Sequence, residues 1–243
     1  MRPVTEGMHS AGDSRPGAVQ VLFVSSHAGL GGSELYLERL LGALGAEWRA
    51  GVIALADGPF VARLRERGVA VEVIPTGRRA GIVRSALHLR RRLRRARPVL
   101  VHANGVKAAL LVALAGLGGG PPAVWVKHDF SRDGRLARWV ARRCRTVVGV
   151  SSVVTESLGP ALADRIRTVS PGVAEPQLEP QRARAMLDEL AGWGTSELLI
   201  ALVGRLGPDK GALGLIEAAP AIRRRFPGAR AILIGRASCR ERV

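Results

Sequence analysis

The sequence predicts an α/β protein with one complete doubly wound parallel sheet and the beginning of a second domain. Short apolar runs alternate strictly with helical patterns from residue 19 to residue 169, as in right-handed β–α–β crossovers. Residues 170–180 contain three prolines and no apolar run, so we expect them to link two domains. The β–α pattern then restarts, which predicts a second Rossmann-like domain.

The expected strands of the first domain are apolar runs bounded by turn residues, which is typical of strands buried on both faces of a parallel sheet. They are residues 19–25, 51–55, 69–74, 99–102, 123–127, 146–151 and 166–169. Between them, apolar residues recur at helical spacing. The expected helices are residues 33–46, 59–67, 82–97, 106–117, 132–143 and 152–163.

The second domain is expected to supply a helix at 181–190, a strand at 198–203, a helix at 210–226 and a strand at 229–234. We therefore expect a disordered leader at 1–18, a first domain at 19–176 and a partial second domain at 177–235. Residues 236–243 resemble the translation of a sequencing adapter, so we expect them to be an artefact and the chain to be truncated. A truncated chain of this kind is expected to be inactive as it stands.

The composition is strongly basic, with a formal net charge of +17, and 34 of the 37 cationic residues are arginine. Such a balance favours anionic partners. The two cysteines exclude a disulfide framework, and a reducing cytosol is the default compartment. The longest apolar stretch, residues 108–117, is too short to cross a bilayer. The expected location is the cytoplasm, with peripheral association at the inner membrane face as an option.

A glycine-rich turn, Gly31-Gly32-Ser33-Glu34, follows the first expected strand and opens a helix. Backbone N–H groups of such a turn can approach an anion at the helix N-terminus. A dinucleotide fingerprint would require glycine at position 34, where Glu34 stands, so a dinucleotide-dependent oxidoreductase is disfavoured. The alternative is a tight turn with Ser33 as the helix N-cap and Glu34 favourable to the helix dipole.

Six segments carry short motifs that are each weak alone. They are 31–34 (GGSE), 101–105 (VHANG), 126–129 (VKHD), 148–151 (VGVS), 169–173 (VSPGV) and 203–211 (VGRLGPDKG). In this order they resemble family 4 glycosyltransferases, which have the GT-B fold of two Rossmann-like domains. The family patterns are GGxE, VHxHG, TVHD, VAVS, IPNGVD and VGRLxPxKG. The chain departs from them with Asn104 in place of the second histidine and Pro171 in place of asparagine.

The resemblance implies that Arg205 and Lys210 bind the diphosphate of a nucleotide-sugar donor, together with Gly31 and Gly32. Preplaced cations stabilise the departing nucleoside diphosphate without a metal ion, so no metal or other cofactor is expected. The alternative is a solvated arginine and lysine. In the family the histidine matching His128 contacts the donor sugar near the reacting carbon, so His128 is the expected catalytic residue. Further residues expected near the cleft are His102, Asn104, Glu34 and Ser151.

The expected helix 82–97 combines an apolar stripe with seven arginines. The simplest interpretation is a solvated face of a helix packed on the sheet. The alternative is docking to anionic lipid headgroups, which suits an enzyme that glycosylates a lipid-linked acceptor. No aromatic residues interleave with the arginines, so a nucleic-acid partner is not expected. The membrane-facing candidates are Arg84, Arg91, Arg94 and Arg95.

We therefore expect a retaining transferase of hexosyl type that moves a sugar from a nucleotide-sugar to a glycan, a lipid-linked or a small-molecule acceptor. Retention by a front-face route is implied by the family, since no carboxylate stands out as a nucleophile. Two alternatives remain: a GT-B nucleotide-sugar 2-epimerase, which would act without an acceptor, and a non-enzymatic basic module that binds membrane or nucleic acid.

Overall fold

The computed structural model describes residues 19–77, 79–130, 134–173, 175, 177–190, 192, 198–204, 206 and 210–235. The chain divides into two compact units that meet at Gly172 and Val173, and each unit is described by itself. The expected leader, residues 1–18, and the expected tail, residues 236–243, lie outside the described residues.

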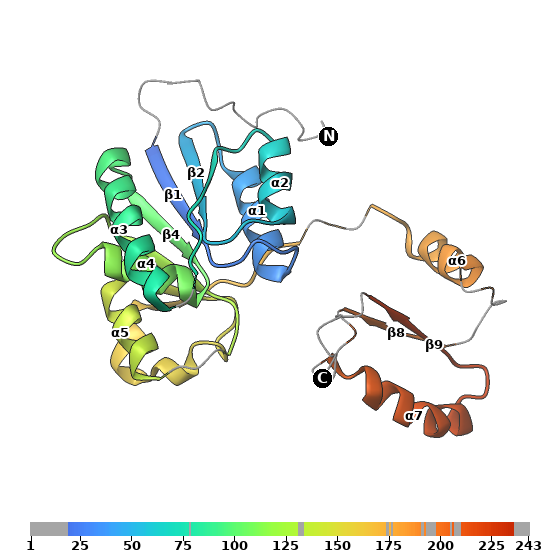
Figure 1. Cartoon of the computed structure of the whole chain (residues 1–243). Coiled ribbons are helices and arrows are strands. Elements are labelled where there is room, and N and C mark those ends of the chain that lie inside the picture. The colour runs from blue at the N-terminus through green and yellow to red at the C-terminus, as the bar shows by residue number, and fades with distance from the viewer. Residues whose placement is uncertain are drawn as a thin grey trace. The chain divides into compact units, whose positions relative to one another are not determined.

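The first unit contains a seven-stranded sheet in the order β3-β2-β1-β4-β5-β6-β7, and every neighbouring pair is parallel (Figure 1). Its strands are β1 (Val19–Ser25), β2 (Trp48–Ala54), β3 (Val71–Val73), β4 (Leu100–Asn104), β5 (Ala123–Lys127), β6 (Thr146–Gly149) and β7 (Ile166–Thr168). The chain builds outward from β1 in one direction and from β4 in the other. The order therefore reverses between β1 and β4, and the predicted doubly wound α/β fold is confirmed.

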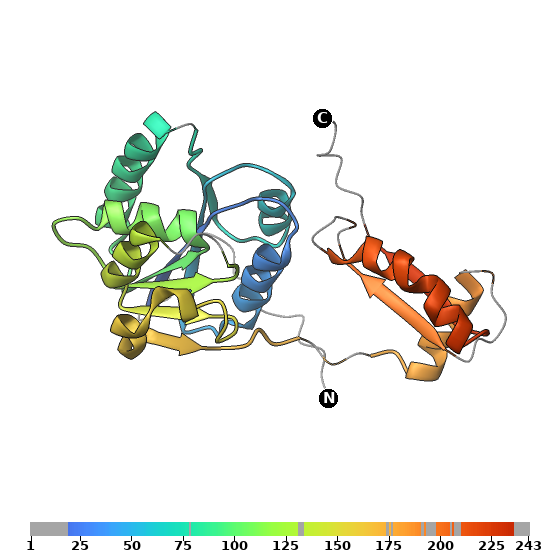
Figure 2. The same ribbon diagram turned by 90° about the horizontal axis from the view of Figure 1, so that it is seen from below.

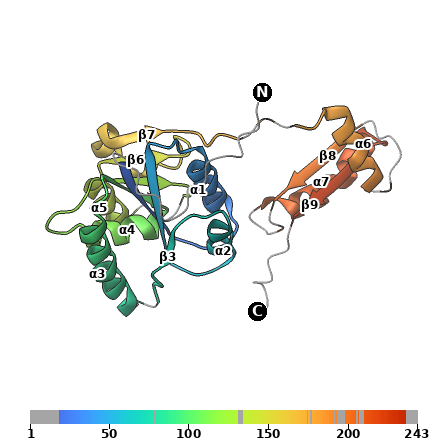
Figure 3. The same cartoon turned by 90° about the horizontal axis from the view of Figure 1, so that it is seen from above.

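Helices cover both faces of this sheet, with α1 and α2 on one face and α3, α4 and α5 on the other (Figures 1 and 3). Alternating residues of β1 explain the two layers, since Phe23 packs in the cluster of α1 and α2 while Val24 packs in the cluster of α3 and α4. The helices are α1 (Gly32–Ala43), α2 (Pro59–Glu66), α3 (Arg79–Ala96), α4 (Val106–Ala115) and α5 (Arg135–Arg143).

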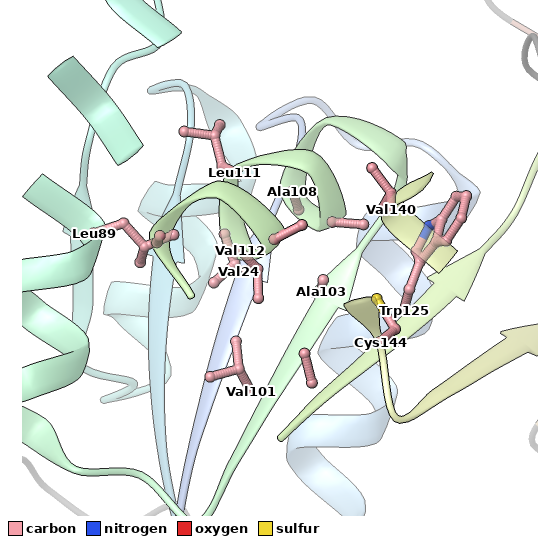
Figure 4. Packing of buried hydrophobic residues seen from close by; sticks show 14 of the residues in the cluster. Val24, Leu89, Val101, Ala103, Ala108, Leu111, Val112, Trp125, Val140 and Cys144 are labelled. Carbon is pink, nitrogen blue, oxygen red and sulfur yellow. The ribbon is translucent and has the colours of Figure 1, made fainter. Parts of the chain in front are cut away.

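The larger core is mostly aliphatic and centres on α4, which is apolar on nearly every face (Figure 4). Trp125 of β5 is its largest member and is fully buried. Cys144 lies in the same cluster, and burial raises the pKa of its thiol to about 12. The thiol therefore stays protonated and packs as a small apolar side chain.

The expected helix at residues 152–163 is wrong. The structure has two short 3₁₀ helices there, η1 (Glu156–Leu158) and η2 (Pro160–Arg165). Gly159 between them adopts a positive φ of 85°, which ends the first helix, and Pro160 has no N–H to continue a helical ladder. The apolar residues Leu158 and Leu162 are still buried, so the helical spacing predicted the buried side chains but not the backbone.

The second unit follows the expected order with α6 (Pro180–Leu190), β8 (Leu199–Val203), α7 (Ala212–Arg225) and β9 (Arg230–Ile234). The two strands pair in parallel, and Figure 2 shows α7 beside them. Among the described residues of this unit no side chain is fully buried. In the part of the chain that the structure describes, no helix is long and apolar enough to span a bilayer.

Candidate functional site

The carboxyl ends of β1, β4 and β5 lie side by side and carry buried polar residues. Ser25 and Ser26 end and follow β1, Asn104 ends β4, and Lys127 ends β5 before the half-buried His128. The Ser26 N–H donates a hydrogen bond to the Asn104 carbonyl oxygen at 3.1 Å. Open α/β sheets bind ligands at this edge, beside the point where the strand order reverses. The candidate site is therefore placed here.

The glycine-rich turn wraps around the carboxylate of Glu34, which is only 3% exposed. Gly31 N–H donates to Glu34 Oε2 at 3.0 Å, and the Ser33 hydroxyl donates to Glu34 Oε1 at 2.8 Å. Gly31 is the N-cap and α1 begins at Gly32, so Ser33 is not the N-cap that the alternative interpretation of this turn assigned. Its hydroxyl bonds to the carboxylate instead, and the carboxylate is favourable to the positive end of the helix dipole.

A chain of hydrogen bonds joins the ends of β5 and β4 to the first turn of α1. His128 Nε2 lies 2.6 Å from Asn104 Oδ1, and Asn104 Nδ2 donates to the Ser33 carbonyl oxygen at 3.0 Å. Asn104 is 1% exposed, whereas His128 is half-buried. The structure thus holds His128 by one side chain that is itself fixed to a helix.

A series of aromatic ring contacts ends at His128. His102 of β4 contacts Phe23 with ring centroids 5.0 Å apart and stacks with Tyr36 at 6.2 Å. Tyr36 and His128 pack in a T-shaped arrangement, with ring centroids 5.0 Å apart. His102 is buried, and it lies beside the site through its contact with the Tyr36 ring. Tyr36 was not predicted as a site residue; the one signal for it in the sequence is that the only tyrosine lies three residues after Ser33.

Burial sets the charge of both histidines. It lowers the pKa of His102 from its ordinary value to about 4. Burial also lowers the pKa of His128, while the negative charges of Asp129 and Glu34 act in the opposite direction. Both rings are therefore neutral near pH 7, and each offers one N–H donor and one acceptor nitrogen.

Replacing His102 with phenylalanine is expected to remove part of the acid sensitivity of the fold. The pKa of His102 is lowered in the folded state, so the unfolded chain binds a proton between about pH 6.5 and pH 4 that the folded chain does not. Stability therefore falls as the pH falls through this window. Urea unfolding measures the free energy of unfolding at about pH 7 and pH 4.5. Its decrease between the two pH values should be about 2 kcal/mol smaller in the variant than in the wild type. The exposed His88 provides the control variant His88→Gln, and equal losses in wild type and His102→Phe would refute the assignment.

Glycine is required after β4 because the chain passes close to Ser26. Gly105 has a positive φ of 93°, and a Cβ there would lie 2.7 Å from Ser26 Oγ. The same Ser26 Oγ accepts a hydrogen bond from Ala108 N–H at 2.9 Å, in the first turn of α4. The edge between β1 and β4 is thus closely packed beside Asn104, and Asn104 is held on its backbone side as well.

The remaining expected site residues are not brought together by the described contacts. Ser151 lies two residues after β6 and is partly exposed. Lys210 belongs to the second unit, where it is exposed and lies two residues before α7. Arg205 lies outside the described residues. No group of three histidine, cysteine or acidic side chains that could hold a metal ion occurs within the described ranges.

The family model described as Glycosyltransferase Family 4 matches residues 30–175. No curated protein sequence matches the chain. The chain is similar to the structure of Anabaena Alr3699/HepE in complex with UDP, with a TM-score of 0.72 and 22% identity. The match covers 91% of this chain and 62% of that one. A structure of HepE with UDP-glucose is also similar. A glycosyltransferase from Rickettsia africae has a TM-score of 0.70 and 18% identity, covering 90% of this chain and 60% of that one. A 2-epimerase likeness is weaker: the putative UDP-N-acetylglucosamine 2-epimerase of Listeria monocytogenes has a TM-score of 0.58 and 13% identity, covering 89% of this chain and 62% of that one.

These solved structures share the fold of the chain, which confirms the predicted GT-B class. The chain spans about 60% of the length of these structures.

Proposed function

The chain belongs to glycosyltransferase family 4, and on this premise we propose that its protein transfers a sugar from a nucleotide-sugar donor to an acceptor. The observation that carries the proposal is the hydrogen-bonded set of Glu34, Asn104 and His128 at the carboxyl edge of β1, β4 and β5. Edges of this kind bind nucleotides and their substrates in doubly wound folds. The complexes of Anabaena HepE with UDP and UDP-glucose support a UDP-sugar as the class of donor to test first.

In this proposal His128 contacts the donor sugar near the reacting carbon, and Arg205 and Lys210 bind the donor diphosphate. Of the two glycines, Gly32 is the better candidate for the diphosphate because the N–H of Gly31 is already bonded to Glu34. A Cβ on Gly32 would meet no atom within 4 Å, so a ligand has room at this point of the turn. Transfer of a hexosyl group with retention, without a metal ion, completes the proposal.

Calorimetry with UDP, GDP and NAD⁺ tests the donor class in the full-length protein. Binding of a nucleoside diphosphate, but not of NAD⁺, is expected because Glu34 stands where a dinucleotide fold needs glycine. Tight binding of NAD⁺ with no binding of either diphosphate would replace the proposal with an oxidoreductase.

We further propose that α3 brings the protein to an anionic membrane surface. The inner face of α3 is buried at Ala86, Leu89 and Leu93, as predicted from the apolar stripe. On the outer face, Val83 is 64% and Leu87 is 52% exposed. At about 100° per residue, these two side chains and four exposed arginines fall within an arc of about 120°. The arginines are Arg84, Arg91, Arg94 and Arg95.

The charge of this outer face supports lipid rather than a neutral partner. The helix contains no acidic residue, and among the described residues none of the four arginines has an ion-pair partner. The nearby carboxylate of Glu72 is instead engaged by Arg92 at 2.5 Å and by His88 at 3.3 Å. Two exposed apolar side chains among unpaired arginines are the combination that anionic headgroups attract.

Replacing all four outer-face arginines with glutamine is expected to weaken binding to phosphatidylserine-containing vesicles at least about tenfold, since each contributes about 1 kcal/mol near such a surface. Sedimentation with the vesicles at low salt measures this binding. The matched control removes four exposed arginines of the second unit: Arg182, Arg223, Arg224 and Arg225. Equal loss of vesicle binding in the two variants would show that this face of α3 is only solvated. Equal sedimentation of the wild type with neutral and anionic vesicles would show the same.

A further inference from the structure

The side-chain amide of Asn104 lies between two groups whose hydrogen-bonding roles can be deduced. Its Nδ2 donates to the Ser33 carbonyl oxygen at 3.0 Å, and its Oδ1 lies 2.6 Å from His128 Nε2. Because Asn104 is only 1% exposed, both ends of the amide must find partners within the protein.

The carbonyl of Ser33 decides which way the amide faces. Turning the amide by half a rotation would place Oδ1 against the Ser33 oxygen, and two acceptors would then face each other. The nitrogen therefore faces Ser33 and the oxygen faces His128. An amide oxygen can only accept, so the proton in the short contact belongs to His128 Nε2.

We propose that Asn104 is a positioning residue that keeps the proton of His128 on Nε2, so that Nδ1 accepts a hydrogen bond from a hydroxyl group of the donor sugar. This inference rests on the proposed function. No hydrogen bond from the described residues reaches His128 Nδ1, whereas Nε2 is occupied. An accepting nitrogen fits an alcohol, which can donate, and does not fit an ionised phosphate oxygen, which can only accept.

Residue 104 is asparagine, where the family pattern has histidine. A histidine at this position could donate or accept, and its own proton could move between nitrogens. Asparagine has no titratable group, so the direction of its bond to His128 does not change with pH. Ser26 N–H also holds the Asn104 backbone carbonyl at 3.1 Å, which fixes the residue from its main-chain side.

Long-range ¹H–¹⁵N correlation spectra of the chain with ¹⁵N-labelled histidine test the tautomer directly. The His128 signals are assigned by their loss in His128→Gln. Near neutral pH the expected spectrum has a protonated, pyrrole-type Nε2 and an unprotonated, pyridine-type Nδ1. A protonated Nδ1 in the wild type would overturn the inference without any variant.

Two variants separate the amide from the aromatic packing. Asn104→Ala should speed solvent exchange of the Nε2 proton at least about tenfold and lower kcat of the full-length protein about tenfold, with nucleotide Kd changed less than about twofold. Tyr36→Phe keeps the ring beside His128 and should leave the tautomer and the proton exchange unchanged. Unchanged proton exchange in Asn104→Ala would also overturn the inference. A protonated Nε2 in a protein that transfers no sugar would contradict the proposed function alone.

Discussion

Replacing His128 with alanine is expected to lower kcat on the order of 100-fold, while the Kd for the nucleotide changes less than about threefold. The physical reason is the position of His128 directly after β5, where it is held by Asn104 and packs against the Tyr36 ring. A group held this rigidly contributes to the transition state rather than to ground-state binding. Steady-state kinetics and calorimetry on the full-length protein measure the two quantities.

The matched control for this variant is His88→Gln on α3, where the ring pairs with Glu72 outside the candidate site. It should leave kcat and nucleotide affinity unchanged. If His128→Ala loses nucleotide affinity and keeps its turnover, then His128 binds the nucleotide and has been given the wrong role.

Replacing Arg205 or Lys210 with alanine is expected to weaken nucleoside diphosphate binding by about 1.5–3 kcal/mol each, which is about 10-fold to 150-fold in Kd. Each cation forms a charge-assisted contact with phosphate oxygens in the proposed role. Lys210 lies two residues before α7, in the second unit. Calorimetric titration of each variant with UDP and GDP measures the loss.

Arg223→Ala removes an exposed charge from the last turn of α7 and is the control. Its affinity should equal that of the wild type. Unchanged affinity of Arg205→Ala and Lys210→Ala for every nucleotide would refute the diphosphate assignment.

The sequence predicted the sheet well because parallel strands buried on both faces are continuous apolar runs. Strands β1 and β5 have the predicted bounds, and each is bracketed by polar or turn-forming residues. Helix spacing was less reliable where glycine and proline interrupt it, as at Gly159 and Pro160. The spacing of apolar residues there predicted the buried side chains correctly. It could not predict the backbone, because the missing N–H of proline does not affect this spacing.

The candidate site was predicted in part. The resemblance to family 4 glycosyltransferases predicted Asn104 and His128 near one cleft, and the structure brings them to one edge because β4 and β5 are parallel neighbours. Their hydrogen bond could not be predicted, since the two residues are 24 positions apart and the contact depends on side-chain rotamers. Tyr36 was missed for a similar reason, because the contacts of its ring depend on how α1 crosses β4.

The arginines of α3 were identified from the sequence, whereas the exposure of Val83 and Leu87 could be seen only in the structure.

Sugar transfer from a nucleotide-sugar is tested most directly by identifying the products that the protein forms. The full-length protein is incubated with a panel of UDP-, GDP- and ADP-sugars, with and without a lipid and glycan acceptor extract, and NMR identifies the products and their anomeric configuration. We expect release of a nucleoside diphosphate from at least one donor, with the sugar joined to an acceptor in the donor's anomeric configuration. Release of no diphosphate from any donor, or conversion of the sugar to its 2-epimer without an acceptor, would contradict it.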